Sequence, residues 1–275
     1  MKSKYMFPDY ETTSAVDIKH VSTDRYASHS STRVLMCAFA FDDGPVELWQ
    51  EGEAGLDGLK RDLRSHIVVP WHAAFEKQIT RHVLKLDGVT WRDAMIAALY
   101  AGFPAGLKEC VKLPFFKGDA ESTKETLLIN KFCRPQKDGS VRNRETDPED
   151  WELFCDYCRR DVQGTRVIWQ WLQDKIPTPD HIWRQWEIDQ AINERGMPID
   201  RLLTYRAWEE AQRLQIREND RLRVLTGLEN PNSSAQLLPW LQERGYPYAS
   251  LGKELVKKAL SEEPDMEDVD LDDDD

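Results

Sequence analysis

The N-terminal part of the chain carries short apolar runs separated by turn residues. Apolar and aromatic residues fill positions 4–7 and 34–41, and the turn sequence at 42–45 precedes a third short run at 46–49. Runs of this length, bounded by Asp, Gly and Pro, are typical of strands. We therefore predict a small meander of three strands at the start of the fold.

Helical and strand signals then alternate. Leucines recur at helical spacing over 56–63, and the β-branched run at 67–71 is short and bounded, as expected for a buried strand. A helix is expected from His72 to Leu84. The order of three strands, a helix, a strand and a helix predicts an α/β domain with a mixed sheet.

From Trp91 onward the periodicity is helical. Asp147 and Pro148 are typical of an N-cap and a first helical residue, and the long helix that they begin must end before Pro177. The prolines within 176–180 mark the best domain boundary. The predicted organisation is an α/β domain at 1–176, a helical C-terminal extension at 177–260 and an acidic tail at 261–275 that we expect to be disordered.

Net charge changes this picture little. The 275 residues include 37 Lys and Arg against 49 Asp and Glu, a formal charge of −12, but the segment 261–275 is rich in acids and contains no base. The remainder is nearly balanced, so the acidity does not exclude a nucleic-acid partner. Arginines interleaved with acids over 201–223 indicate a solvated helix face, with DNA contact as the alternative.

Compartment signals are few. No apolar run approaches the length of a membrane span, and residues 1–6 lack an apolar signal-like stretch. Five cysteines, an odd number, suit a reducing compartment rather than a disulfide framework. We therefore expect a cytoplasmic protein with no membrane partner.

Two short motifs in the first domain contain acids at suggestive spacing. Asp9 and Glu11 occupy alternate strand positions and would share a face, although such a pair alone is more typical of an exposed strand end. His72 and Glu76 lie four residues apart, just after a buried strand, where open α/β sheets place their sites. A helix-surface pair is the alternative interpretation.

A third motif, Tyr157-Cys158-Arg159-Arg160-Asp161, lies in the long helix. Its spacing places the phenol of Tyr157 and the carboxylate of Asp161 on one face. An Asp among core positions in the middle of a helix is unfavourable for propensity and for burial. Asp161 therefore requires a compensating cation.

Four acids thus come from a first strand, a strand-to-helix junction and a late helix: Asp9, Glu11, Glu76 and Asp161. Oxygen-only ligands suit hard cations such as Mg²⁺ or Mn²⁺. Two such ions, about 3.5–4 Å apart, can stabilise both the attacking and the leaving oxygen of a phosphodiester. The pattern favours a two-metal hydrolytic site in which Tyr157 aligns the water.

The ordered motifs D-Y-E-T, H-A-A-F-E and Y-C-R-R-D-V resemble the three exonuclease motifs of the DEDDy 3′-5′ exonucleases. Together they look like the proofreading domain of phage-type family A (polymerase I-like) DNA polymerases. The sequence between the motifs also resembles that family. The sequence at 186–200 and 230–245 resembles the segment that joins the exonuclease domain to the thumb of those polymerases. The resemblance implies a ribonuclease H-like fold.

The resemblance also assigns roles to the motif residues. Asp9, Glu11 and Asp161 would hold the metals, Glu76 would act on the outer metal, and Tyr157 would orient the nucleophilic water.

Three positions depart from expectation. His72 stands where Asn is usual and would contact substrate or neighbouring ligands, so its charge could shift the pH optimum. Glu76 stands where many members have Asp, although it still supplies a carboxylate. Pro8 predicts local irregularity beside Asp9, because proline lacks a ladder donor.

The function implied is a metal-dependent 3′-5′ exonuclease that releases 5′-mononucleotides from single-stranded or frayed DNA. Palm and fingers motifs are absent from the sequence, so we expect no polymerase activity from this chain alone. It would act as a stand-alone nuclease or beside a separate polymerase chain. Two alternatives stay open: a ribonuclease D-like exoribonuclease, and a non-catalytic DNA-binding or assembly subunit.

The most basic stretch lies at 131–144. Its cations are candidates for DNA-backbone contact, with a solvated surface as the alternative; they are Lys131, Arg134, Lys137, Arg142 and Arg144. The pair Cys155-x-x-Cys158 supplies too few ligands to indicate a zinc site.

Overall fold

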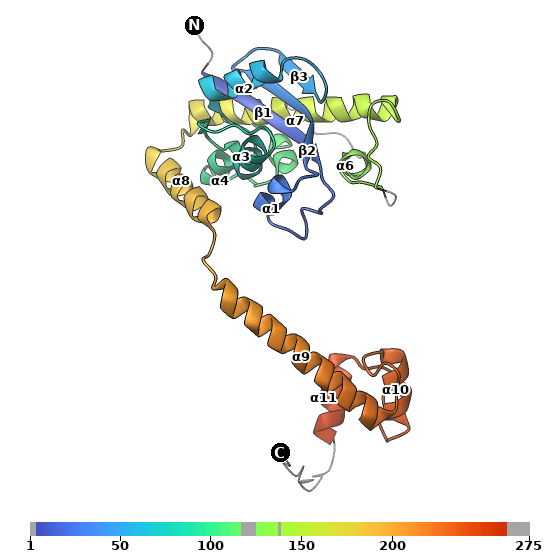
Figure 1. Cartoon of the computed structure of the whole chain (residues 1–275). Helices are drawn as coiled ribbons and strands as arrows, with labels where there is room; N and C mark the ends of the chain where they lie inside the picture. The colour runs from blue at the N-terminus through green and yellow to red at the C-terminus, as the bar shows by residue number, and fades with distance from the viewer. Residues whose placement is uncertain (1–3, 117–124, 137–138, 263–275) are drawn as a thin grey trace. The chain divides into compact units, whose positions relative to one another are not determined.

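The computed structural model describes residues 4–116, 125–136 and 139–262. The chain divides into two compact units, Met1–Gly196 and Met197–Asp275, each considered by itself below. Figure 1 labels most of the elements along the chain.

The first unit contains a mixed sheet. Its strands are β1 (Tyr5–Thr13), β2 (Arg33–Phe41), β3 (Val46–Gln50), β4 (Ile67–Val68) and β5 (Thr90–Trp91). They lie in the order β3-β2-β1-β4-β5, with β2 antiparallel to both of its neighbours and with β4 and β5 continuing the sheet in parallel. This mixed sheet, flanked by helices, confirms the ribonuclease H-like α/β fold expected from the sequence.

Helices cover the sheet in the first unit (Figure 1). They are α1 (Thr23–Ser28), α2 (Leu56–Ser65), α3 (Ala73–His82), α4 (Ala94–Tyr100), α5 (Leu107–Val111), α6 (Glu125–Phe132), α7 (Pro148–Lys175) and α8 (Asp180–Arg195). The predicted start of the long helix at Pro148 is confirmed, although Asp147 makes no side-chain cap and pairs instead with Lys131 and Arg142.

Two strand boundaries differ from the sequence pattern. The first strand continues to Thr13, so Asp9 and Glu11 lie within β1 rather than at its end. The strand expected at 67–71 ends at Val68, because the ladder stops there and Pro70 follows. The extension of β1 matters most, because a paired strand fixes the direction of both carboxylates.

Pro8 is accommodated without a lost ladder bond. The N–H of Val69 donates to the carbonyl oxygen of Met6 at 2.8 Å, so Met6 turns its backbone towards β4. The backbone of Pro8, two residues later, faces the same side of β1 as that of Met6. The β1–β4 ladder has already ended there, so the missing N–H of Pro8 leaves no ladder bond unmade. The predicted irregularity falls further on, as a register shift between Glu11 and Thr12.

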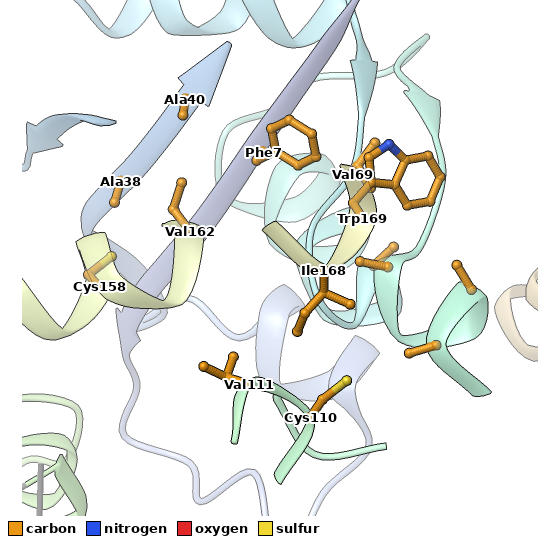
Figure 2. Packing of buried hydrophobic residues seen from close by; sticks show 14 of the residues in the cluster. Phe7, Ala38, Ala40, Val69, Cys110, Val111, Cys158, Val162, Ile168 and Trp169 are labelled. Carbon is orange, nitrogen blue, oxygen red and sulfur yellow. The ribbon is translucent and has the colours of Figure 1, made fainter. Parts of the chain in front are cut away.

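Alternation along β1 and β2 separates two hydrophobic layers. Phe7, Ala38 and Ala40 face α7, where they pack with Val162, Ile168 and Trp169 (Figure 2). Residues of the opposite parity join a second cluster with α1, α2 and α3; they include Met6, Cys37 and Phe39. The sheet is therefore buried on both faces, and α7 is fixed against β1 by apolar contact.

The first unit extends to Gly196, past the boundary predicted at 176–177. The reason is that Trp183 and Trp186 of α8 are buried in the same cluster as Trp169 of α7. The ring centroids of Trp169 and Trp183 lie 5.9 Å apart, and those of Trp183 and Trp186 lie 6.1 Å apart. The prolines at 177 and 179 therefore turn the chain within a unit instead of separating two units.

The second unit is helical, as expected, with α9 (Arg201–Thr226), α10 (Ser234–Gln242) and α11 (Lys253–Glu262). Along α9, Arg213, Arg221 and Arg223 each pair with an acid three residues earlier. These pairs agree with the solvated face predicted for the arginines. The helix α11 includes positions 261–262 of the predicted acidic tail, and 263–275 lie outside the described residues.

Within the part of the chain that the structure describes, no helix has the length and apolar character needed to cross a bilayer.

Trp183→Ala should lower the free energy of unfolding by about 3–5 kcal/mol, because it removes a buried ring from the core of the first unit. Trp208→Ala on α9 is the matched control: that ring is 57% exposed and its loss should change stability by no more than about 0.5 kcal/mol. Urea denaturation followed by circular dichroism measures both. Equal effects would show that α8 does not belong to the core.

Candidate active site

The first two acids of the site project from the middle of the sheet. Asp9 and Glu11 share the face of β1 that carries Phe7, which is the face against α7. Asp9 is half-buried and Glu11 is 8% exposed. Their carboxylates and the thiol of Cys158 on α7 offer ligand atoms that all lie within 4.8 Å of one another.

The helix α7 brings the third motif to the same place. Burial and then the charge of Asp9 raise the pKa of Asp161, and burial followed by the charges of Asp9 and Asp161 raises the pKa of Glu11. Tyr157, one turn before Asp161, lies close enough to its carboxylate for each group to shift the pKa of the other. The predicted i,i+4 relation of phenol and carboxylate is therefore present and is directed at the two acids of β1.

Glu76 approaches from the first turn of α3. It is only 6% exposed, and its Oε2 atom is buried without a hydrogen-bond partner among the described residues. The nearby charge of Asp9 raises the pKa of Glu76. A buried carboxylate oxygen without a donor is costly unless a cation compensates it. The structure thus brings together all four acids of the sequence motifs.

Burial dominates the electrostatics of this group. It raises the pKa of Asp9 to about 6 and, with the charge of Asp9, raises that of Asp161 to about 7. Burial and neighbouring negative charge hold the pKa of Glu11 and of Glu76 well above the usual range. Carboxylates crowded in this way resist full ionisation unless positive charge is added. The arrangement therefore favours a bound cation.

His72 occupies a strained position immediately before α3. Its backbone has φ 116° and ψ 62°, in the left-handed region that non-glycine residues rarely adopt, and its exposed side chain makes no capping bond. The helix that carries Glu76 begins at the next residue. His72 thus shapes the turn that leads to Glu76.

Asp93 holds this turn in place, and the sequence motifs did not include it. Its Oδ2 accepts a hydrogen bond from the N–H of Ala73 at 2.9 Å, while its Oδ1 caps α4 through the N–H groups of Met95 and Ile96. Burial raises its pKa to about 6, although these bonds oppose the rise. An Asp directly before an apolar helical run is an N-cap signal, but its bond to Ala73 is long-range and not readable from sequence.

Two thiols border the acids and were also missed. The Sγ atom of Cys158 lies 3.4 Å from Asp9 Oδ2, and that of Cys133 lies 3.7 Å from Glu11 Oε2. Cys155 instead contacts Gln50. The Cys155-x-x-Cys158 pair is therefore divided between two environments, which agrees with setting aside a zinc site built from that pair.

The basic stretch is largely engaged with acids. Lys131 belongs to α6 and contacts Asp147 and Asp150. Other ion pairs join Arg134 to Asp17, Arg142 to Asp147 and Arg144 to Glu53. Lys137 lies outside the described residues. Contact with a DNA backbone at these positions stays a prediction, and it would require these cations to exchange partners.

Comparisons with known proteins found sequence similarity to a DNA polymerase. No protein-family model matches it. A DNA polymerase of Bacillus phage SP02 is 33% identical over 267 residues, which cover 92% of this chain and 40% of that polymerase. The chain therefore spans about two fifths of the length of the curated relative that it matches.

Among solved structures, Brucella melitensis NrnC aligns with a TM-score of 0.42 and 15% identity, over 69% of this chain and 83% of NrnC. The structure of Brucella melitensis NrnC with bound Mg²⁺ aligns with a TM-score of 0.30 and 12% identity, over 65% and 90% of the two chains. Over most of its length, then, the chain is similar in sequence to part of a phage DNA polymerase.

Metal-free protein should lose stability as the pH rises from about 4 to about 7. The pKa values of Asp9 and Asp161 rise on folding from 3.8 to about 6 and about 7, so in this window the folded state keeps protons that the unfolded state has lost. Urea denaturation in a chelator at several pH values measures the slope. Adding Mg²⁺ should flatten it, because a bound cation favours the ionised acids. An equal slope with and without Mg²⁺ would contradict the prediction.

Asp93→Ala should lower the free energy of unfolding by about 1–2 kcal/mol, because it removes the cap of α4 and the bond to Ala73. It should also reduce the rise in melting temperature caused by Mg²⁺, because the start of α3 no longer fixes Glu76. Asp93→Asn keeps an oxygen acceptor and should lose less on both measures. Equal losses in the two variants would mean that the acceptor geometry is unimportant.

Proposed function

We propose that this chain is a metal-dependent 3′-5′ exonuclease of the DEDDy type, which releases 5′-mononucleotides from the 3′ end of single-stranded or frayed DNA. The observation that carries the proposal is the convergence of four acids from β1, α3 and α7, two of them buried and two half-buried, which raise one another's pKa, with Tyr157 beside Asp161. Structural ion pairs do not explain this group, since neighbouring carboxylates are the main charges that the acids meet.

The donor set fits hard divalent cations. Asp9, Glu11 and Asp161 would hold them, and Glu76 would meet the outer ion with the oxygen that has no hydrogen-bond partner. Bound Mg²⁺ or Mn²⁺ would supply water activation and stabilisation of the leaving 3′ oxygen. The proposed site holds two such ions.

Tyr157 acts in this proposal as an orienting group rather than as a base. Burial and the surrounding carboxylates raise the pKa of its phenol far above neutrality, so the hydroxyl keeps its proton. The ring of Tyr157 stacks on that of Phe154, with centroids 6.1 Å apart, which limits the directions that the phenol can take. A phenol held in this way can position a water molecule for in-line attack on the terminal phosphodiester.

DNA as substrate is supported by the similarity to a phage DNA polymerase. The same similarity supports a polymerase module as a partner, and a phage-infected cytoplasm as the place of action. An RNA substrate of the ribonuclease D type is the second outcome of the substrate test, and a non-catalytic assembly subunit is the third.

Asp161→Ala should abolish Mg²⁺-dependent shortening of a 5′-labelled DNA oligonucleotide, because it removes an acid shared by the proposed metals and by Tyr157. Asp156→Ala is the matched control on the same helix: Asp156 is exposed and pairs with Arg159, so cleavage should persist. Circular dichroism verifies folding of both variants. Wild-type-level cleavage by the Asp161 variant would overturn the assignment.

The same assay with labelled RNA separates the substrate classes. Shortening of RNA but not DNA would replace the proposal by a ribonuclease D-like activity. Absence of cleavage of both, in Mg²⁺ and in Mn²⁺, would favour a binding or assembly role.

A further inference from the structure

A cysteine thiol, which is a soft ligand that a hard-metal site does not need, lies beside the acids of the site. Cys158 lies on α7 beside Tyr157, is fully buried, and directs its thiol at Asp9. Its Sγ is 3.4 Å from Asp9 Oδ2 and 3.6 Å from the carbonyl oxygen of Asp9. With Asp9 and Glu11 it forms a group of potential ligand atoms that all lie within 4.8 Å of one another.

This spacing suits tetrahedral coordination. Zinc binds cysteine sulfur at about 2.3 Å and carboxylate oxygen at about 2.0–2.2 Å, so two such ligands on a tetrahedral ion lie about 3.5–3.7 Å apart. The distance of 3.4 Å between Cys158 Sγ and Asp9 Oδ2 is nearly that edge. The separation therefore allows an ion to bridge sulfur and oxygen with little movement of α7 or β1.

A second observation concerns Glu76, whose carboxylate lies near enough to Asp9 to feel its charge. The Oε2 atom of Glu76 is buried without a hydrogen-bond partner among the described residues, and Glu76 feels the charge of Asp9. The acid is more than nine-tenths buried. It would meet an added cation at Asp9 without having to break any existing hydrogen bond at Oε2.

We propose that Cys158, Asp9 and Glu11 form a binding site for a soft divalent cation such as Zn²⁺ or Cd²⁺, with the sulfur of Cys158 as a direct ligand. On binding, the thiol proton passes to solvent and the thiolate joins the two carboxylates. This ion shares Asp9 and Glu11 with the hard cations proposed above, so it displaces them. That competition rests on the proposed function, whereas the sulfur-ligated site does not.

Sulfur is the feature that separates this site from a general acidic cluster. Carboxylates alone favour Mg²⁺ and Mn²⁺, whereas a thiolate selects zinc and similar metals. The chain would therefore change from a hydrolytic to an inhibited state when soft cations outcompete Mg²⁺. Asp161 and Tyr157 need not take part in holding the soft ion.

The test is a titration of the full chain with Cd²⁺, followed by the ultraviolet charge-transfer band of a cadmium thiolate. Wild type should give the band, and Cys158→Ser should lose it together with more than about tenfold in Cd²⁺ affinity, since even outer partners of a metal site are worth that much. Cys155→Ser is the matched control. Cys155 is buried on the same helix but faces Gln50, so its variant should keep the band. A band that survives in the Cys158 variant overturns the proposal.

A second measurement does not depend on a variant. X-ray absorption of the zinc-loaded wild type should show one sulfur at about 2.3 Å beside oxygen ligands near 2.0 Å. A shell of oxygen and nitrogen alone overturns the proposal even if Cys158→Ser fails to fold.

Competition is read from the same samples. Excess Mn²⁺ should displace the cadmium band, and Zn²⁺ should inhibit Mg²⁺-dependent cleavage less in Cys158→Ser than in wild type, each relative to its own activity in Mg²⁺. A wild-type band without any DNA cleavage leaves the sulfur-ligated site in place and removes only the proposed nuclease. Cleavage without a band overturns the sulfur-ligated site and leaves the proposed nuclease in place. A band that excess Mn²⁺ leaves unchanged overturns the proposal that the soft ion shares Asp9 and Glu11 with the hard cations.

Discussion

The crowding of four acids, two of them buried and two half-buried, is the constraint on which the site depends. Glu11 and Glu76 are almost inaccessible to water. Asp9 on β1 and Asp161 on α7 lie close enough for the negative charge of Asp9 to raise the pKa of Asp161 further than burial alone. Such a group costs folding free energy in proportion to how fully it ionises. The fold tolerates it because hydrophobic contact on both faces of the sheet holds the elements together regardless of the state of the acids.

The long helix α7 makes that tolerance possible. Its apolar positions pack on β1 and β2 along one face, so the position of Tyr157 and Asp161 is set by the burial of residues such as Phe154, Val162 and Trp169. The tryptophans of α8 extend the same cluster. Because the polar residues lie between apolar ones on a single helix, they cannot move away from one another without exposing the core.

The approach of Glu76 has a different physical origin. It depends on a left-handed residue, His72, and on Asp93, whose carboxylate accepts from the N–H of Ala73 and also caps α4. Backbone strain at His72 is thereby offset by a buried hydrogen bond. The thiol of Cys158 also offsets a cost of burial. Its contact with Asp9 lowers the pKa of that acid, which burial raises.

The sequence by itself determined the mixed sheet and the start of α7, because strand alternation and a proline at the first helical position are local signals. It also singled out the four acids, through their spacing and the order of the motifs. It placed the domain boundary too early, since the burial of Trp183 against Trp169 is not visible in a pair of prolines. Only the tertiary structure decided that Asp93 reaches Ala73 and that Cys158 reaches Asp9. Those contacts join segments far apart in the chain, and their distances follow from how α7, α3 and α4 pack on the sheet rather than from any local pattern.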